Sequence, residues 1–153
     1  MLEHRDQILK IAALPLSPEE RIVALIRNEI EALTGRLEAF SIVFHELKFF
    51  RRSEHFAYLI AARKTGYDAW GSIIEEGIEK GLFHKELDVA LAIATIARML
   101  NAAADLHKNE DGLAFDRGYS LEELTAFYVG FILRSIRAPS RAGEPIPDPA
   151  TDI

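Results

Sequence analysis

Residues 17–34 read SPEERIVALIRNEIEALT, and this stretch carries a complete set of helix signals. Ser17 supplies an N-cap hydroxyl, Pro18 stands at the first helical position, and Glu20 completes a capping box. Apolar residues then recur every three or four positions, which is the period of one helix face. These apolar positions are Ile22, Leu25, Ile26, Ile30 and Leu33. The stretch therefore predicts an amphipathic helix from Pro18 to about Thr34.

Helical patterns cover most of the remaining chain. Upstream, a helix over residues 2–13 must end before Leu14, because Pro15 disfavours the helical conformation in the residue that precedes it. No alternating run of β-branched and aromatic residues is bounded by hairpin dipeptides, so strands are not expected. Downstream helices are predicted over residues 37–50, 53–80, 89–108 and 121–136. We therefore expect an all-α bundle of about six helices.

Further capping signals and glycines shape the later helices. Ser120 and Glu123 form a second capping box at the start of the last helix. The residues from Val89 to Ala94 are apolar almost all round, so other helices must enclose them. Three glycines inside the predicted helix 53–80 each cost about 1 kcal/mol relative to alanine, and they indicate close backbone approach or a bend. These glycines are Gly66, Gly71 and Gly77.

Length and composition indicate one domain. A chain of 153 residues with 49% hydrophobic residues can build one core, which we place in residues 1–137. Residues 138–153 hold four of the six prolines, and this segment is expected to be a disordered tail.

Charge and cysteine content exclude several classes of protein. Without cysteine, disulfide frameworks and thiolate sites are impossible, and a cytoplasmic location is expected. A net charge of −6 argues against nucleic-acid binding by this chain alone. The start of the chain lacks the apolar centre of a secretory signal. The apolar stretch from Val89 to Ala104 contains Arg98 and is too short to cross a bilayer about 30 Å thick, so no membrane association is expected.

Catalytic and metal-binding motifs are missing from the sequence. A di-iron bundle needs Glu-x-x-His pairs, and no glutamate is followed three residues later by histidine. Neither a Gly-x-Ser-x-Gly elbow nor a phosphate-binding glycine loop occurs. The five histidines lie on different predicted elements and are His4, His45, His55, His84 and His107. We therefore expect no enzyme activity, no metal and no cofactor.

Aromatic residues concentrate along two of the predicted helices and could line an elongated apolar cavity with a few polar groups. The same aromatic residues could equally be part of an ordinary hydrophobic core. Arg63 could reach solvent, pair with an acid such as Glu38 or Glu46, or meet an anionic ligand group. The candidate ligand-binding residues are Phe40, Phe44, His45, Phe56, Arg63, Tyr67, Trp70, Met99 and Asn101.

The last two helices have more apolar surface than a small bundle needs to bury internally, so a twofold dimer is the natural solution. The alternative is that both helices are simply internal. The candidate dimer-interface residues are Leu100, Ala104, His107, Phe127, Phe131 and Arg134.

Taken in order, several motifs resemble the C-terminal domain of the TetR family of bacterial transcriptional regulators. They are the segment from Leu16 to Arg21, then Arg63, Tyr67, Trp70, Gly77 and Gly81-Leu82-Phe83, then Leu87-Asp88, Met99-Leu100-Asn101 and the segment from Ser120 to Leu124. Only order and spacing carry this resemblance, because no single motif is specific. One departure is Ala102-Ala103-Ala104, followed by Leu106-His107, where many relatives carry bulky aromatics.

The resemblance implies a homodimer in which the last two long helices of each subunit form a four-helix bundle. It also implies a pocket for a small apolar or amphipathic effector, which controls DNA binding by an N-terminal helix-turn-helix domain. Leu2-Glu3-His4-Arg5 resembles the middle of the helix that links the two domains, so we expect that N-terminal domain to be absent here. DNA binding would belong to the parent repressor alone. A small helical enzyme or metal-binding bundle, and a helical adaptor without a ligand site, remain alternatives.

Overall fold

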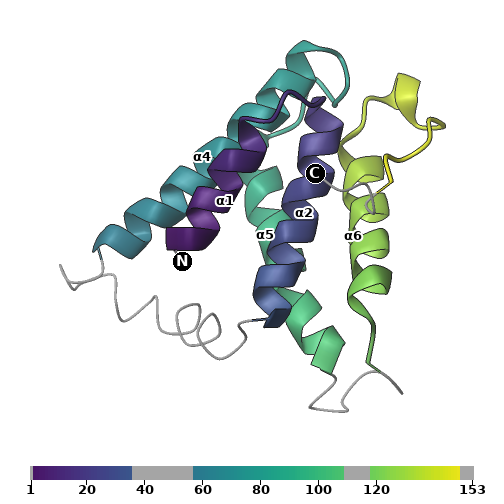
Figure 1. Cartoon of the computed structure of the whole chain (residues 1–153). Helices are drawn as coiled ribbons and strands as arrows, with labels where there is room; N and C mark the ends of the chain where they lie inside the picture. Colours follow the sequence, from purple (N-terminus) through teal and green to yellow (C-terminus); the bar gives the residue numbers. More distant parts are fainter. Residues whose placement is uncertain (1, 36–56, 109–117, 149–153) are drawn as a thin grey trace.

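The computed structural model describes residues 2–35, 57–108 and 118–148, and within these residues the chain is helical (Figure 1). An isolated antiparallel β-bridge joins Phe83 to Arg137, and no strand is formed in the described ranges. The elements are α1 (Leu2–Ala12), α2 (Pro18–Gly35), α4 (Ala57–Glu79), α5 (Val89–Lys108), α6 (Leu121–Ile136) and the short 3-10 helix η2 (Pro139–Arg141). The expected all-α class is confirmed.

Helix boundaries follow the capping signals. Ser17 Oγ accepts the amide of Glu20 at 3.3 Å, and the Glu20 carboxylate accepts the amide of Ser17 at 2.8 Å. The same reciprocal pair joins Ser120 and Glu123, at 3.1 and 2.9 Å. These bonds satisfy amides that otherwise have no partner in a first helical turn. Both predicted capping boxes are therefore confirmed. The helix predicted over residues 37–50 lies outside the described residues.

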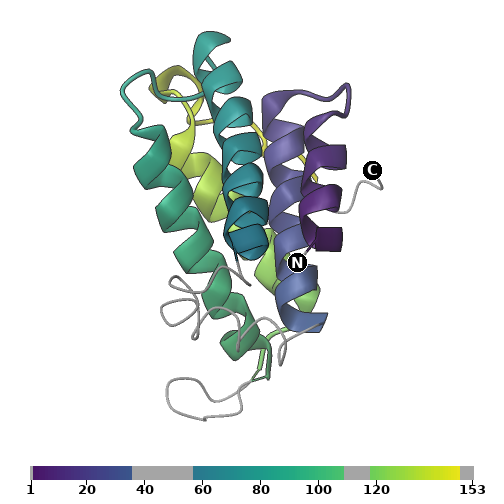
Figure 2. The same ribbon diagram turned by 90° about the vertical axis from the view of Figure 1, so that its left-hand side faces the viewer.

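Helix α2 occupies the centre of the bundle. It packs against α1, α4, α5 and α6, and Ile22, Leu25 and Ile26 have no exposed surface. Helix α1 lies along α4 and also contacts α2, while α6 lies on the other side of α2 (Figure 1). Helix α5 runs behind them and contacts α2, α4 and α6 (Figures 1 and 2). The apolar face predicted from the sequence of α2 thus forms the middle of the hydrophobic core.

The end of α4 is shaped by two glycines. Gly81 has a φ of 70°, a conformation that glycine adopts at little cost, and its position ends the helix. The carbonyl of Gly77 accepts the amides of Leu82 and Phe83 at 2.8 and 3.2 Å. The Phe83 ring then lies against Gly77, where an added Cβ would come within 2.2 Å of it. Gly77 thus makes room for an aromatic side chain, whereas the sequence predicted a close backbone approach or a bend.

A buried ion pair fixes the end of α6. Arg137 donates from Nε to Glu19 Oε1 at 2.7 Å, with side chains 1% and 8% exposed. Arg137 also donates to the carbonyls of Glu144 and Pro145, and Ile146 packs on the core. Ala138, Glu144, Pro145 and Ile146 thus contact the bundle. The disorder expected of residues 138–153 stays a prediction. The division of the chain at residue 137 stays a prediction.

Candidate functional site

Arg63 and Tyr67 form a polar pair one turn apart on α4. The guanidinium donates from Nε and Nη2 to Tyr67 Oη at 3.0 and 2.6 Å. The Arg63 Cζ atom also lies 5.1 Å from the centroid of the Tyr67 ring, which is a cation–π distance. Both side chains are half-buried. The sequence identified both residues but did not foresee their pairing, although the spacing i, i+4 permits it.

The other predicted ligand residues divide into two groups. Trp70 is buried at 5% exposure, and Met99 packs against the core, while Asn101 is half-buried on α5. Phe40, Phe44, His45 and Phe56 lie outside the described residues. The described chain therefore places an arginine and a tyrosine together on α4 beside buried apolar residues, and the complete ligand-binding set stays a prediction.

Helix α1 contacts α4 close to the Arg63–Tyr67 pair. Gly66 lies between these two residues in sequence, and an added Cβ at Gly66 would meet Ile8 of α1 at 3.4 Å. His4 of α1 bonds through Nε2 to the Glu29 carboxylate of α2 at 2.8 Å. The structure thus brings the N-terminal helix into contact with the helix that carries the candidate ligand-binding pair.

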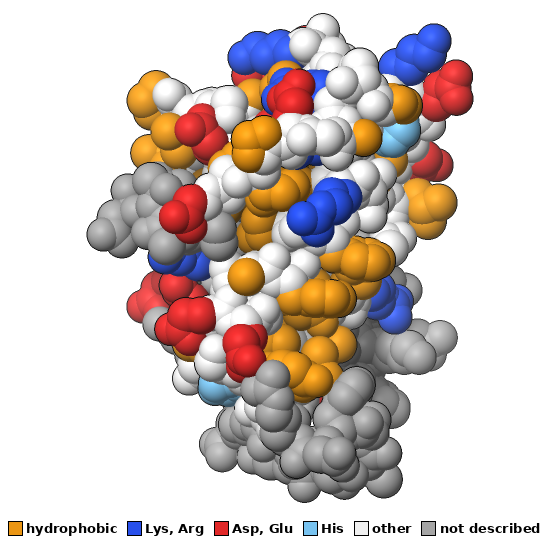
Figure 3. All heavy atoms as spheres, turned by 90° about the vertical axis from the view of Figure 1, so that its right-hand side faces the viewer, with side chains coloured by type: hydrophobic (Ala, Val, Ile, Leu, Met, Phe, Trp, Pro, Cys, Tyr) orange, Lys and Arg blue, Asp and Glu red, His pale blue; other side chains and the backbone are white. Residues whose placement is uncertain are grey.

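Two of the predicted dimer-interface residues, Phe127 and Phe131, form an exposed aromatic patch on α6. Their exposed fractions are 62% and 49%, and their rings stack with centroids 5.9 Å apart. Phe127 also contacts the Tyr128 ring edge-to-face at 5.5 Å, and burial raises the pKa of Tyr128. Hydrophobic side chains gather on the face of the molecule that carries α6 (Figure 3). Leu91 on α5, which the sequence interpretation overlooked, is 65% exposed.

The remaining candidates for the dimer interface lie in different surroundings. Leu100 and Ala104 are buried within the single chain, at 1% and 6% exposure, so they belong to its core and not to its surface. His107 Nδ1 bonds to the carbonyl of Tyr119 at 2.8 Å. Arg134 is exposed, and its guanidinium folds back over Gly130, where an added Cβ would come within 2.9 Å of it. Leu91 and Leu100 lie nine positions apart and therefore on opposite faces of α5. This spacing could have predicted that only one of the two faces the core.

Metal binding and membrane insertion are two further properties of interest. Among the residues that the structure describes, no group of three histidine, aspartate or glutamate side chains could hold a metal ion. In the same residues, the stretch Val89–His107 is long and apolar enough to cross a membrane by length and composition. Helix α5 buries Ile93, Ile96 and Leu100 against its neighbours, but only 28% of this stretch is buried within the single chain. Ala90, Leu91 and Ala94 are exposed, so the single chain does not enclose the start of α5 as expected.

Comparisons with known proteins agree on one family. A family model described as tetracyclin repressor-like, C-terminal domain, matches residues 15–108. The HTH-type transcriptional repressor KstR2 of Rhodococcus jostii (strain RHA1) is 29% identical over 83 residues, which are 54% of this chain. The chain spans 41% of that relative's length.

A solved structure shares the fold. The ketosteroid transcriptional regulator KstR2 of Mycobacterium tuberculosis superimposes with a TM-score of 0.77 at 20% sequence identity. The match covers 89% of this chain and 67% of that protein. The family model alone spans more than half of the chain, and the motifs that resembled TetR regulators fall largely within it. The chain therefore belongs to the tetracyclin repressor-like, C-terminal domain family.

Proposed function

We propose that this chain is the effector-binding and dimerisation domain of a TetR-like transcriptional repressor. The domain would bind a small apolar or amphipathic molecule and form a homodimer with a second copy. It would have no enzyme activity. DNA would be bound only through a helix-turn-helix domain of the parent protein, in the cytoplasm. Family membership and the repressor named among its relatives support this assignment.

The observation that carries dimerisation is the exposed aromatic patch of Phe127 and Phe131. Large apolar side chains in contact with water mark interaction surfaces when they cluster, and these two stack on one another. Leu91 adds a third apolar side chain on the neighbouring helix α5, and α5 packs against α6. A twofold axis through this face would bury both patches with the same residues on each subunit.

Ligand binding is supported by the residues on α4. A half-buried guanidinium and a phenol that packs against the hydrophobic core can orient the polar end of a mainly apolar ligand. The solved relative is a ketosteroid transcriptional regulator, so steroid-like molecules belong among the first ligands to test. Fatty and aromatic molecules form the rest of the panel.

Control of DNA binding requires that the ligand distinguish two arrangements of the dimer. A ligand shifts such an equilibrium only by its difference in affinity between the two states. Helix α1 contacts α4 through Ile8 and Gly66, so it is suited to respond to changes at the Arg63–Tyr67 pair. The proposed effector would therefore act on the parent protein through α4 and α1.

Sedimentation equilibrium tests the dimer directly. We expect the chain to sediment as a dimer at tens of micromolar protein, a concentration at which interfaces of standard size are occupied. A monomer at that concentration would contradict the proposed pairing. Isothermal titration with steroid-like, fatty and aromatic compounds tests the ligand site separately, and saturable binding at one site per chain is expected.

A further inference from the structure

The ends of α4 and α6 are joined through the turn that follows α4. His84 donates its amide to the carbonyl of Ile136 at 2.9 Å, and Ala138 donates its amide to the carbonyl of Leu82 at 2.9 Å. These two hydrogen bonds flank the bridge between Phe83 and Arg137. A displacement of residues 82–84 must therefore either move the end of α6 or break these bonds.

Phe83 ties this turn to α4. Its side chain is 1% exposed, and its ring covers Gly77 so closely that an added Cβ would come within 2.2 Å. The carbonyl of Gly77 also accepts the amides of Leu82 and Phe83. Close packing of this kind leaves little room for independent motion. The last turn of α4 and the turn 81–84 therefore behave as one body.

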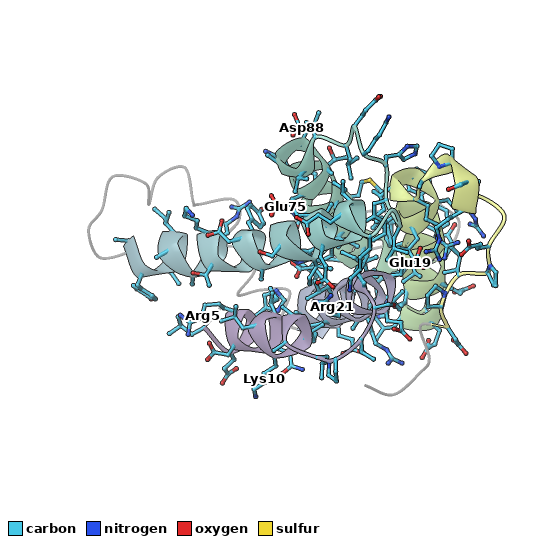
Figure 4. All side chains as sticks on the ribbon, turned by 90° about the horizontal axis from the view of Figure 1, so that it is seen from above. Arg5, Lys10, Glu19, Arg21, Glu75 and Asp88 are labelled. Atoms are coloured by element: carbon cyan, nitrogen blue, oxygen red, sulfur yellow. The ribbon has the colours of Figure 1, made fainter. Side chains whose placement is uncertain are left out.

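Arg137, at the end of α6, adds side-chain hydrogen bonds to this contact between α4 and α6. Its three guanidinium nitrogens donate to Glu19 at 2.7 and 3.3 Å, to the carbonyl of Glu144 at 2.6 Å and to the carbonyl of Pro145 at 2.8 Å. The planar fork fits these acceptors in a fixed geometry. Seen from above, Glu19 lies on the side of α6 and the C-terminal segment, whereas Arg21 lies toward α1 and α4 (Figure 4). Arg137 thus holds the start of α2, the end of α6 and the C-terminal segment together.

We propose that Arg137 is a positioning residue of a rigid joint, formed by residues 81–84 and 136–146, that transmits displacements of α4 to α6. This inference rests on the proposed function, since it links the helix that carries Arg63 and Tyr67 to the helix that carries the exposed aromatic patch. The C-terminal segment then takes part in this transmission, because the carbonyls of Glu144 and Pro145 accept hydrogen bonds from the Arg137 guanidinium.

The test uses a perturbation in α4 and a readout in α6. Gly77→Ala pushes on the Phe83 ring, and native-state amide exchange reports on residues 132–136 at the end of α6. Exchange at residues 96–100 of α5 corrects for any loss of global stability. In the wild-type background we expect the Gly77→Ala substitution to accelerate corrected exchange in α6 about 10-fold, because a weakened segment opens locally at a lower free energy. In the Arg137→Lys background we expect an acceleration of less than about 3-fold, because coupled sites are not additive.

The proposal would be overturned if Gly77→Ala accelerated corrected amide exchange in α6 equally in the two backgrounds. It would also be overturned if the substitution did not accelerate this exchange in the wild-type background. Should the Arg137→Lys chain fail to fold, a chain that ends at Gly143 removes the carbonyls of Glu144 and Pro145 and leaves every described α-helix intact. Should Gly77→Ala fail to fold, Phe83→Leu perturbs the same contact. The readout needs neither a ligand nor a dimer, so a monomeric wild-type chain would contradict the proposed function without deciding the joint.

Discussion

Arg137 and Glu19 form a buried ion pair between residues 118 positions apart in the sequence, with Arg137 Nε and Glu19 Oε1 at 2.7 Å. Arg141 donates to the other oxygen of the same carboxylate at 3.3 Å. The pair connects the first turn of α2 to the end of α6, so helices from the two ends of the sequence share one polar contact inside the fold. Both side chains make further hydrogen bonds: Arg137 donates to two backbone carbonyls, and Glu19 accepts from Arg141. A buried ion pair needs such additional hydrogen bonds to offset its loss of hydration.

Removing one member of this pair should destabilise the chain strongly. Arg137→Met leaves the Glu19 carboxylate buried with only Arg141 beside it, and we expect the free energy of unfolding to fall by roughly 3 kcal/mol. The double variant Glu19→Met/Arg137→Met leaves no unpaired buried charge from the pair and should recover at least about 1 kcal/mol of that loss. Urea unfolding measures both variants. A double variant less stable than Arg137→Met alone would contradict this account.

Gly77 should not tolerate a side chain. Gly77→Ala places a Cβ within 2.2 Å of the buried Phe83 ring, and we expect overpacking to cost about 1–3 kcal/mol of unfolding free energy. Gly35→Ala is the matched control, because nothing lies within 4 Å of its added Cβ and the residue ends α2. The control should leave stability unchanged or raise it by up to about 1 kcal/mol. Thermal unfolding measures both variants. Equal melting temperatures for Gly77→Ala and Gly35→Ala would contradict the close contact between Gly77 and Phe83.

Glu76 should make stability depend on acid pH. Lys80, and after it Arg21, hold the pKa of the Glu76 carboxyl below its ordinary value of 4.5. A carboxyl whose pKa is lowered by folding stabilises the fold above its unfolded pKa, and this contribution is lost as the pH falls through the folded pKa. Urea unfolding between pH 7 and about pH 3 should therefore show a shallower decline in the Glu76→Gln variant than in the wild type. Glu75→Gln, an exposed neighbour on the same helix, is the control and should keep the wild-type slope.

Much of the fold could be predicted from local signals. Capping boxes and apolar periodicity predicted where α2 and α6 begin, because these signals act within a few residues. Contacts between distant residues could not be predicted in this way. The pairing of Glu19 with Arg137 depends on how α2 meets α6, and the sequence does not show that Arg137 binds the carbonyls of Glu144 and Pro145.

The candidate site was only partly predictable for the same reason. Phe127 and Phe131 were assigned to a surface, and both are exposed. Leu100 was assigned to the same surface but lies in the core, since the apolar sequence of α5 does not show which side faces inward. Arg63 and Tyr67 were both identified as candidate ligand-binding residues, while the hydrogen bonds that pair them required coordinates.

Replacing Phe127 should weaken dimerisation without unfolding the chain. Its side chain is 62% exposed, so Phe127→Ser should change the unfolding free energy of the isolated chain by no more than about 0.5 kcal/mol. Loss of a large aromatic side chain from an interface should raise the dimer dissociation constant at least about 10-fold. Sedimentation equilibrium measures the constant, and Glu122→Gln on the same helix is the control. An unchanged constant for Phe127→Ser would place the dimer interface elsewhere.

Arg63 should matter for the ligand and not for the fold. Arg63→Met removes a half-buried guanidinium that bonds to Tyr67, and we expect the affinity for an amphipathic ligand with a polar end to fall about 10-fold, the effect of losing one charged hydrogen bond. The affinity for a purely apolar ligand should change by less than about 3-fold. Isothermal titration compares the two ligands, with Lys64→Met as the exposed control. Equal losses for both ligands would argue against a polar contact from Arg63.

The central claim is that this chain pairs with a second copy and holds a small molecule, and native mass spectrometry of the purified protein tests both parts at once. We expect a complex of twice the 17.2 kDa chain mass that carries additional mass from a retained or added apolar ligand. That additional mass should leave on denaturation. A species of single-chain mass at tens of micromolar protein, with no added mass in the presence of the ligand panel, would contradict the claim.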